Sequence, residues 1–293
     1  MDKTVFETNL KSLQLLHRGK VRDLYLIDQD RLLIVQTDRI SAFDTVLPSP
    51  VPGKGEVLTK MSKYWFKKFS KLVPNHYLDI DPSTVVGQNE QDEIKGRALV
   101  VKKLKPLAFE AVVRGYLAGS GWKEYQSSMR ISGHRIESGL NLGDKLSYPL
   151  FTPSTKATSG EHDQNISFEV MEKAVGKEIA NIIKEKSILL YEHASSFCGD
   201  KGLILADTKF EFGLDDQGQV FLIDEILTPD SSRFWSRDTH KIGLPPLSYD
   251  KQYVRDWLDS QAWDKVSEPP LLPENIIVET QKKYQQALKS ICG

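Results

Sequence analysis

The sequence contains few of the residues from which disulfide frameworks and closed zinc sites are built. Its 293 residues include two cysteines, Cys198 and Cys292, which are too few for either. No apolar run approaches the roughly 18 residues that a membrane-spanning helix needs, and the first residues lack the apolar core of a secretory signal. We therefore expect a cytoplasmic protein with reduced thiols and no membrane partner.

An excess of one charge is also missing. Lysine and arginine total 39 and aspartate and glutamate total 40, so the formal net charge is -1. A chain so close to neutral has no overall attraction for nucleic acid, and we expect no nucleic-acid partner. An anionic substrate would have to be bound by local clusters of lysine and arginine.

Familiar nucleotide-binding signatures are absent as well. The segment Gly53-Lys54-Gly55 has neither the spacing nor the hydroxyl of a P-loop. The sequence contains no GxGxxG motif, no HRD and DFG set of the protein kinases, and no histidines at metal-ligand spacing. These absences argue against P-loop, dinucleotide-binding and protein-kinase enzymes.

Apolar patterning predicts a mixed fold in which strands precede most of the helices. The expected strands are 24–28, 31–38, 98–104, 109–117, 202–214 and 219–227, and the expected helices are 57–72, 168–196, 249–258 and 276–291. Residues 47–55 and 133–164 are expected to be irregular because they are rich in glycine, proline, serine and charge. This order indicates an α+β fold with a cleft between two lobes.

The most informative segment is the strand pair at 202–227. Successive side chains of a strand point to opposite faces, so Asp207, Lys209 and Glu211 share one face. The returning strand brings Asp224 and Glu225 next to them. Carboxylates in this arrangement suit Mg²⁺, which takes one or two carboxylates together with phosphates and water. An equally open alternative is a solvated sheet face with cross-strand ion pairs.

Residues 228–233, which follow the acidic strand, resemble the start of a helix with several capping residues. A helix N-terminus offers free N–H groups to an anion, and Arg233 adds a guanidinium group. A cation site beside an anion site is what phosphoryl transfer requires.

Three further polar segments are candidate binding sites, each with a structural alternative. Residues 17–23 form a basic turn around a glycine, which suits phosphate but is also a common surface turn. Residues 37–44 are a dense polar run in which Asp and Ser could serve capping and turns. Residues 114–121 join an arginine to a glycine-rich bend, where an anion could approach Arg114 and the backbone near Ser120.

Seven segments together resemble the motifs of the SAICAR synthetase family, both in their residues and in their order along the chain. They are GKVRDLY, TDRISAFD, VVRGYLAGSGW, PLFTPSTKA, GEHDQNIS, LADTKFEFG and DEILTPDSSRFW, which run from Gly19 to Trp235. The residues of these segments are most similar to those of a monofunctional, fungal-like branch of the family. The resemblance implies a two-lobed fold, similar to protein kinases and ATP-grasp enzymes, with antiparallel sheets and a nucleotide cleft. It implies a nucleotide-binding lobe at 1–105 and a substrate- and metal-binding lobe at 106–293.

The resemblance also implies the reaction. An ATP-dependent ligase would condense carboxyaminoimidazole ribotide (CAIR) with L-aspartate to give SAICAR, ADP and phosphate in purine biosynthesis, through an acyl phosphate. The expected cofactors are ATP and Mg²⁺, and the expected state is a monomer. The alternative is a phosphotransferase on the same fold, which would consume ATP without needing aspartate.

Site residues follow from the resemblance by matching its motifs. The implied groups are Lys209, Arg233 and Asp224 for catalysis; Asp207, Glu211 and Asp224 for the metal; Gly19, Lys20, Arg22, Val101 and Lys103 for ATP; Arg114, Ser120 and Arg233 for the ribotide; and Asp38, Arg39, Ser41 and Lys156 for aspartate.

Overall fold

A computed structural model describes residues 4–156 and 164–293 of the chain. These residues divide into two compact units. Among the described residues, the first unit comprises 4–68, 76–104 and 250–293, and the second comprises 69–75, 105–156 and 164–249. One boundary of the units lies between residues 104 and 105, residues 69–75 belong to the second unit, and residues 250–293 belong to the first. The division into a nucleotide lobe at 1–105 and a substrate lobe at 106–293 stays a prediction.

The first unit is built on an antiparallel sheet in the order β1-β2-β3-β7-β6. Its strands are β1 (Gln14–Arg18), β2 (Arg22–Leu26), β3 (Arg31–Gln36), β7 (Ala98–Lys102) and β6 (Tyr77–Leu78). Alternate residues of β3 enter different clusters: Leu33 and Val35 pack on one face, and Ile34 packs with Val101 on the other. The sheet is therefore apolar on both faces, which explains the near-continuous apolar run in β3.

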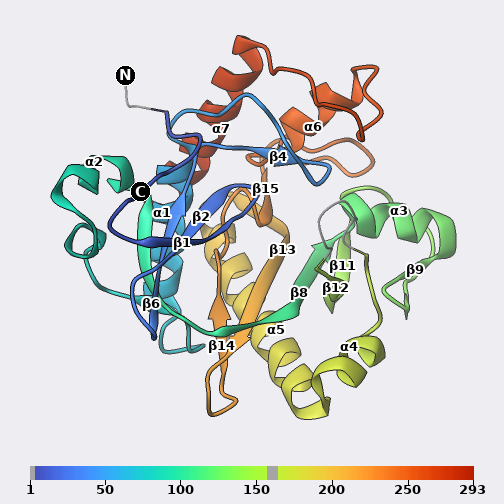
Figure 1. Ribbon diagram of the computed structural model, residues 1–293. Helices are drawn as coiled ribbons and strands as arrows, with labels where there is room; N and C mark the ends of the chain where they lie inside the picture. Colours follow the sequence, from blue (N-terminus) through green and yellow to red (C-terminus); the bar gives the residue numbers. More distant parts are fainter. Residues whose placement is uncertain (1–3, 157–163) are drawn as a thin grey trace. The chain divides into compact units, whose positions relative to one another are not determined.

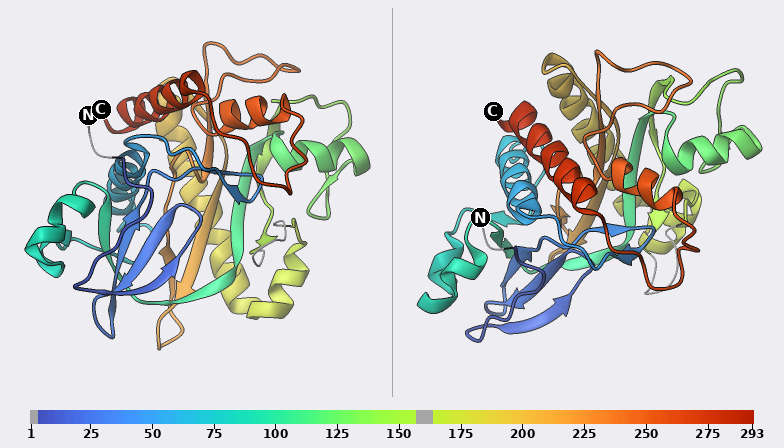
Figure 2. Two further views of the ribbon diagram at one scale, coloured as in Figure 1. Left: turned by 45° about the horizontal axis from the view of Figure 1, so that its top comes forward. Right: turned by 90° about the horizontal axis from the view of Figure 1, so that it is seen from above.

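Helices and a short hairpin complete the first unit. They are α1 (Lys54–Lys68), α2 (Gln91–Ile94), α6 (Gln252–Asp259), α7 (Glu274–Cys292), two 3-10 turns at Pro82–Val85 and Gln88–Glu90, and the hairpin of β4 (Ser41–Ala42) and β5 (Thr45–Val46). Helices α1 and α7 pack side by side (Figure 2). The two C-terminal helices are confirmed, and α1 begins and ends earlier than predicted.

The second unit is built on another antiparallel sheet, in the order β11-β8-β13-β14. Its strands are β8 (Lys105–Tyr116), β11 (Lys145–Phe151), β13 (Leu203–Leu214) and β14 (Val220–Ile223), with β12 (Ser154–Thr155) paired to β8 and β15 (Ser232–Ser236) paired to β13. Helix α5 (Lys177–Asp200), preceded by α4 (Phe168–Val175), packs against this sheet (Figure 1). The helix predicted at 168–196 is thus divided in two at Gly176.

Three predictions about elements of the second unit were wrong. The supposed helix start at 228–233 is a turn that leads into β15. The glycine-rich bend is the beginning of helix α3 (Gly119–Ser128). The stretch expected to be irregular contains β10 (His134–Arg135), which pairs with β9 (Arg130–Ile131), as well as β11 and β12. Among the described residues, no helix has the length and apolar character needed to cross a bilayer.

Candidate active site in the second unit

Strand β13 brings two of the predicted arginines to the same carboxylate. Asp207 is paired with Arg114 of β8 on one side and with Arg233 of β15 on the other. Its Oδ2 atom accepts hydrogen bonds from an Nη1 of each, at 3.2 Å from Arg114 and 2.6 Å from Arg233. The side chains of Asp207 and Arg114 are buried, whereas that of Arg233 is 23% exposed. Arg233 is therefore the member of this group that a ligand can reach most easily.

The remaining donors of Arg114 hold the guanidinium group in one orientation. Its Nε donates to Thr152 Oγ1 at 3.0 Å, and Nη2 donates to Ser120 Oγ at 3.0 Å and to Asn165 Oδ1 at 3.4 Å. Burial lowers the pKa of Arg114 and the charge of Asp207 opposes that shift, and an arginine keeps its proton in proteins. The result is a fixed, buried positive charge with a nearly complete set of partners.

Helix α3 begins directly against the two arginines because glycines leave room for them. A Cβ at Gly119, where φ is +52°, would lie 2.4 Å from Arg233 Nη2, and a Cβ at Gly121 would lie 3.1 Å from Arg114 Cδ. The N–H groups of a first helical turn have no partner within the helix and attract anions. The structure thus brings together Arg114, Ser120 and Arg233, as predicted, and adds a helix N-terminus that the sequence analysis had placed elsewhere.

A second charged group lies further along the same two strands. Glu110 of β8 is paired with Glu211 of β13, and two like charges at such a position repel each other. Two lysines offset this repulsion: Lys209 Nζ lies 2.5 Å from Glu110 Oε1, and Lys156 Nζ lies 2.6 Å from Glu211 Oε2. These four side chains form what we call the lysine–glutamate cluster.

Three carboxylates act on Lys209, and one of them, Glu110, was not indicated by the sequence. Burial opposes its charge, but the carboxylates of Glu110, Glu211 and Asp224 outweigh burial and raise its pKa. Lys209 is therefore a permanent cation at neutral pH and is not available as a base. Glu110 was missed by the sequence analysis; the available signal was a single charge within the otherwise apolar run at 107–113, since an unpaired glutamate is rarely buried.

Asp224 lies at the end of β14, one residue beyond the pair that Ile223 makes with Glu211. Its φ of +69° is unusual for a residue other than glycine, and such conformations are concentrated at functional sites. The next residue, Glu225, is buried and accepts a hydrogen bond from Thr228 Oγ1 at 2.9 Å. Glu225 therefore stabilises the turn that leads to β15.

The three predicted metal ligands do not form one group. Asp207 is turned toward the two arginines, whereas Glu211 and Asp224 both act on Lys209. Within residues 4–156 and 164–293, no three or more His, Cys, Asp or Glu side chains are arranged to hold a metal ion. Two carboxylates with a nearby cation still have the donor chemistry that Mg²⁺ takes when phosphates supply its other ligands.

The predicted ATP residues lie in the first unit. Gly19 and Lys20 form the turn of the β1–β2 hairpin, closed by a hydrogen bond of 2.8 Å from the Gly19 amide to the Arg22 carbonyl. Lys20 is half exposed, and its ammonium group lies 2.7 Å from Asp44 Oδ1. The turn therefore presents a cation at the surface.

Val101 and Lys103 differ in what they can offer a nucleotide. Val101 is buried in β7 and is paired with strands on both sides, Leu32 of β3 and Tyr77 of β6. Lys103 is exposed, and its amide donates to the carbonyl of Asp30 at 2.8 Å. Much of the β7 backbone is thus used by the sheet, which limits the backbone contacts that this strand can make with ATP.

The structure gives Asp38 a structural role in place of the predicted contact with aspartate. Its side chain is fully buried. Oδ1 accepts from the Gly55 amide at 3.0 Å and from Arg97 Nη1 at 3.1 Å, and Oδ2 accepts from the Val5 amide at 2.8 Å. Both carboxylate oxygens are occupied by the protein itself, so no face remains for a ligand.

Arg39 is likewise a structural residue. It is 3% exposed and donates to Asp23 Oδ1 at 2.7 Å, to the Phe6 carbonyl, and to the carbonyls of Gly19 and Lys20 at 3.0 and 3.1 Å. The structural alternative for residues 37–44 is therefore the better interpretation of this side chain. Its contacts also hold the β1–β2 turn, which contains the predicted ATP residues.

The other two predicted aspartate residues lie in different units. Ser41 begins β4 in the first unit and is half-buried, whereas Lys156 belongs to the lysine–glutamate cluster of the second unit. The adjacent segment 157–163, which includes the first half of the GEHDQNIS motif, lies outside the described residues.

Known proteins resemble this chain along almost its full length. The model of the SAICAR synthetase family matches residues 15–270. A phosphoribosylaminoimidazole-succinocarboxamide synthase from Nitrosomonas europaea is 52% identical over 286 residues, covering 97% of each chain. Its similarity exceeds that of the yeast protein described next, so the expected fungal-like character does not distinguish the chain from bacterial members.

Solved structures agree with the sequence relatives. The SAICAR synthase of Saccharomyces cerevisiae, solved in complex with SAICAR, superposes with a TM-score of 0.89 at 39% identity and covers 98% of both chains. A type-2 SAICAR synthetase, solved in complex with ADP, gives a TM-score of 0.69 at 25% identity and covers 93% of this chain and 96% of its own. The α+β fold with antiparallel sheets is therefore that of the SAICAR synthases.

Proposed function

Because the chain belongs to the SAICAR synthetase family, we propose that it condenses CAIR with L-aspartate at the expense of ATP, forming SAICAR, ADP and phosphate in purine biosynthesis. The observation that carries this to individual residues is the arrangement along β13. Asp207 orients two arginines beside the N-terminus of α3, and Lys209 and Glu211 follow at alternate positions of the same strand. The anion site at the arginines thus lies next to the lysine–glutamate cluster, as phosphoryl transfer to an anionic substrate requires.

The ribotide binds at the arginines. Arg114, Arg233, Ser120 and the first turn of α3 provide positive charge and hydrogen-bond donors for its phosphate and carboxylate groups. Asp207 keeps the two like-charged guanidinium groups together by accepting from both. Its role is to position these arginines, and it is no longer assigned to the metal.

The lysine–glutamate cluster and Asp224 form the phosphoryl-transfer site. Glu211 and Asp224 hold Mg²⁺, which when bound offsets the charge of the ATP phosphates. Lys209 stays protonated and stabilises negative charge on the carboxylate and on the transferred phosphoryl group. Glu110 holds the ammonium group of Lys209 in place through its ion pair.

The chemistry requires activation of a poor acyl donor. The carboxylate oxygen of CAIR attacks the γ-phosphorus of ATP, the bond to the bridging oxygen breaks, and ADP leaves an acyl phosphate behind. The amine of aspartate then attacks the acyl carbon, loses a proton, and expels phosphate. No enzyme nucleophile takes part, so the protein acts by orientation and by charge.

The other two substrates are assigned from the remaining predicted residues. Gly19, Lys20 and Arg22 contact the ATP phosphates, and Lys103 and the face that contains Val101 lie near adenine. Arg39 contributes indirectly because it holds the turn at Gly19 and Lys20. Ser41 and Lys156 remain the candidates for aspartate.

The test is ADP release by the purified protein with Mg-ATP and CAIR, in the presence and absence of L-aspartate. We expect ADP release that depends on aspartate and equals SAICAR formation. A Lys209→Met variant, which removes the charge at nearly constant length, should release neither product, whereas the matched Lys201→Met control on the surface should behave like wild type. ADP release that is indifferent to aspartate would instead establish the phosphotransferase alternative.

The enzyme is further proposed to act in the cytoplasm as a monomer. The small number of cysteines supports the cytoplasmic assignment. Light scattering coupled to gel filtration should give a mass near 33.2 kDa. A mass near twice that value would replace the monomer with a dimer.

A further inference from the structure

The β8–β13 ladder separates at one end of the second sheet. The last pair in the register is Arg114 with Asp207, although β8 continues to Tyr116 and β13 begins at Leu203. Tyr191 of α5 enters at this point and donates to the Leu205 carbonyl at 2.8 Å. It fits because the neighbouring residue is Gly115: a Cβ there would lie 1.9 Å from Tyr191 Oη.

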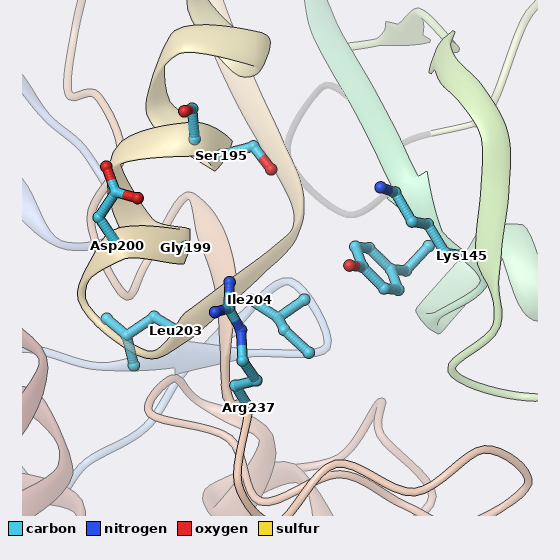
Figure 3. A pocket seen from close by; sticks show the side chains of 9 residues that line it. Lys145, Ser195, Gly199, Asp200, Leu203, Ile204 and Arg237 are labelled. Atoms are coloured by element: carbon cyan, nitrogen blue, oxygen red, sulfur yellow. The ribbon is translucent and has the colours of Figure 1, made fainter.

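A cavity of about 510 Å³ lies at this separation (Figure 3). Its lining comes from the ends of β8 and α5, the starts of β11 and β13, and the segment after β15, and it includes Tyr116, Lys145, Ser195, Asp200, Ile204 and Arg237. None of the residues assigned above to ATP, ribotide, aspartate or metal lines it. A drug-sized or metabolite-sized ligand occupies a cavity of roughly 300–1,000 Å³, whereas one water takes about 30 Å³.

Two cations of the lining are not used by the protein. Lys145 and Arg237 are exposed, and neither side chain has a hydrogen bond or an ion pair with any residue in the described part of the chain. Figure 3 shows the Lys145 ammonium group and the Arg237 guanidinium group directed into the same space. Two cations facing one cavity suit a dianion such as a phosphate monoester.

The other walls of the cavity offer contacts to the hydroxyl groups and to a ring of a ligand. The Tyr116 ring is held edge-on by Trp235 and by His240, with centroids at 5.7 and 6.1 Å. The Asp200 carboxylate has no partner among the described residues, and a carboxylate at such a position accepts hydrogen bonds from sugar hydroxyls. Ile204 adds an apolar surface.

We propose that this cavity binds a hydroxylated phosphate monoester, with the phosphate at Lys145 and Arg237 and the hydroxyls at Asp200. Bare phosphate fills only part of the volume, and a neutral sugar leaves both cations without a partner. The inference is separate from the ligase activity, since it uses none of the residues assigned to that reaction.

Ribose 5-phosphate is the probe, and equilibrium dialysis of the full chain with the labelled compound is the measurement. We expect two classes of site in wild type, one at the Arg114–Arg233 group and one in the cavity. Arg237→Ala should weaken the second class by about tenfold or more, because a charge-assisted contact is lost. Arg237→Lys should restore part of the affinity, and Lys241→Ala, an exposed cation of the same loop outside the lining, should change nothing.

Further arms distinguish this site from the ribotide site. Arg233→Ala should remove the first class and leave the cavity class intact. Ribose alone should not bind, and inorganic phosphate should bind more weakly than ribose 5-phosphate. Loss of all binding in Arg233→Ala, or unchanged binding in both Arg237→Ala and Lys145→Ala, would overturn the proposal. Failure of the ligase reaction itself would be seen separately, as aspartate-independent ADP release.

Discussion

Two clusters of aspartate and arginine, one in each unit, share their residue types and differ in what they do. In the first unit, Asp38 and Arg39 are buried, and every carboxylate oxygen of Asp38 is occupied by the protein. In the second unit, Asp207 is buried between two arginines, yet Arg233 is 23% exposed and faces the start of a helix. Exposure separates the two clusters: a ligand can reach Arg233, whereas Asp38 and Arg39 are enclosed by the protein and stabilise the fold.

The largest effect expected from this comparison is on stability. Asp38→Ala should lower the free energy of unfolding by about 3–5 kcal/mol, because the buried Arg97 keeps only the longer ion pair with Glu56 and two amides lose their acceptor. Urea denaturation measures the loss. Asp30→Ala, at an exposed position, is the control. A stable Asp38→Ala protein with a raised KM for aspartate would return Asp38 to the aspartate site.

The second largest effect is expected on kcat, without a change in stability. Asp224→Asn should reduce kcat by about 10²–10³-fold, since a charged group is lost from the phosphoryl-transfer site. The melting temperature should stay close to that of wild type, because asparagine also tolerates a positive φ. Asp216→Asn, in the exposed turn between β13 and β14, serves as the control. Full activity of Asp224→Asn would remove its assignment to the metal.

A smaller effect should separate the ribotide from the nucleotide. Arg233→Ala should raise the KM for CAIR by about tenfold to a hundredfold, because a charge-assisted contact is worth roughly 1.5–3 kcal/mol. The KM for ATP should change much less. Initial-rate kinetics with each substrate varied in turn make the measurement, and the reverse order would move Arg233 to the nucleotide side.

The smallest effect concerns pH. The pKa of Lys209 is raised despite burial, and Glu110, which is not assigned to the metal, pairs with its ammonium group, so this ion pair is intact at neutral pH and is lost only as the pH rises through the raised value. Between about pH 7 and pH 10, kcat should therefore show no limb due to Lys209. The check is the pH profile of Lys209→Arg, whose guanidinium does not titrate. An alkaline limb present in wild type and absent from Lys209→Arg would make Lys209 a titrating catalytic group.

Local structure was largely predictable because helices and strands produce short periodic patterns of apolar and polar residues. The alternation at 203–214 predicted that Asp207, Lys209 and Glu211 share a strand, and the 3.6-residue pattern predicted α5 and α7. One error in the predicted elements arose because glycine is compatible with two local structures, a bend and a closely packed helix start. Gly119 and Gly121 indicated a bend, but the structure uses them to let a helix begin against two guanidinium groups.

The sequence predicted which residues lie in the charged sites better than it predicted what each residue does there. Arg114, Ser120 and Arg233 come together as predicted, whereas Asp207 joined the arginines and left the predicted metal group. Glu110 was missed because nothing in its own segment shows that Glu211 will lie opposite. The cavity beside Tyr116 was equally invisible, since it arises where two strands separate.

The amino-acid sequence by itself determined the elements, the side chains that share each strand face, and, through its motifs, the family. Only the tertiary structure decided which charges neutralise each other and which remain for a ligand. The physical reason is distance along the chain: Asp207 meets Arg114 across 93 positions and Arg233 across 26. Strand register sets such pairings, and burial then decides whether a charged side chain stabilises the fold or binds a substrate.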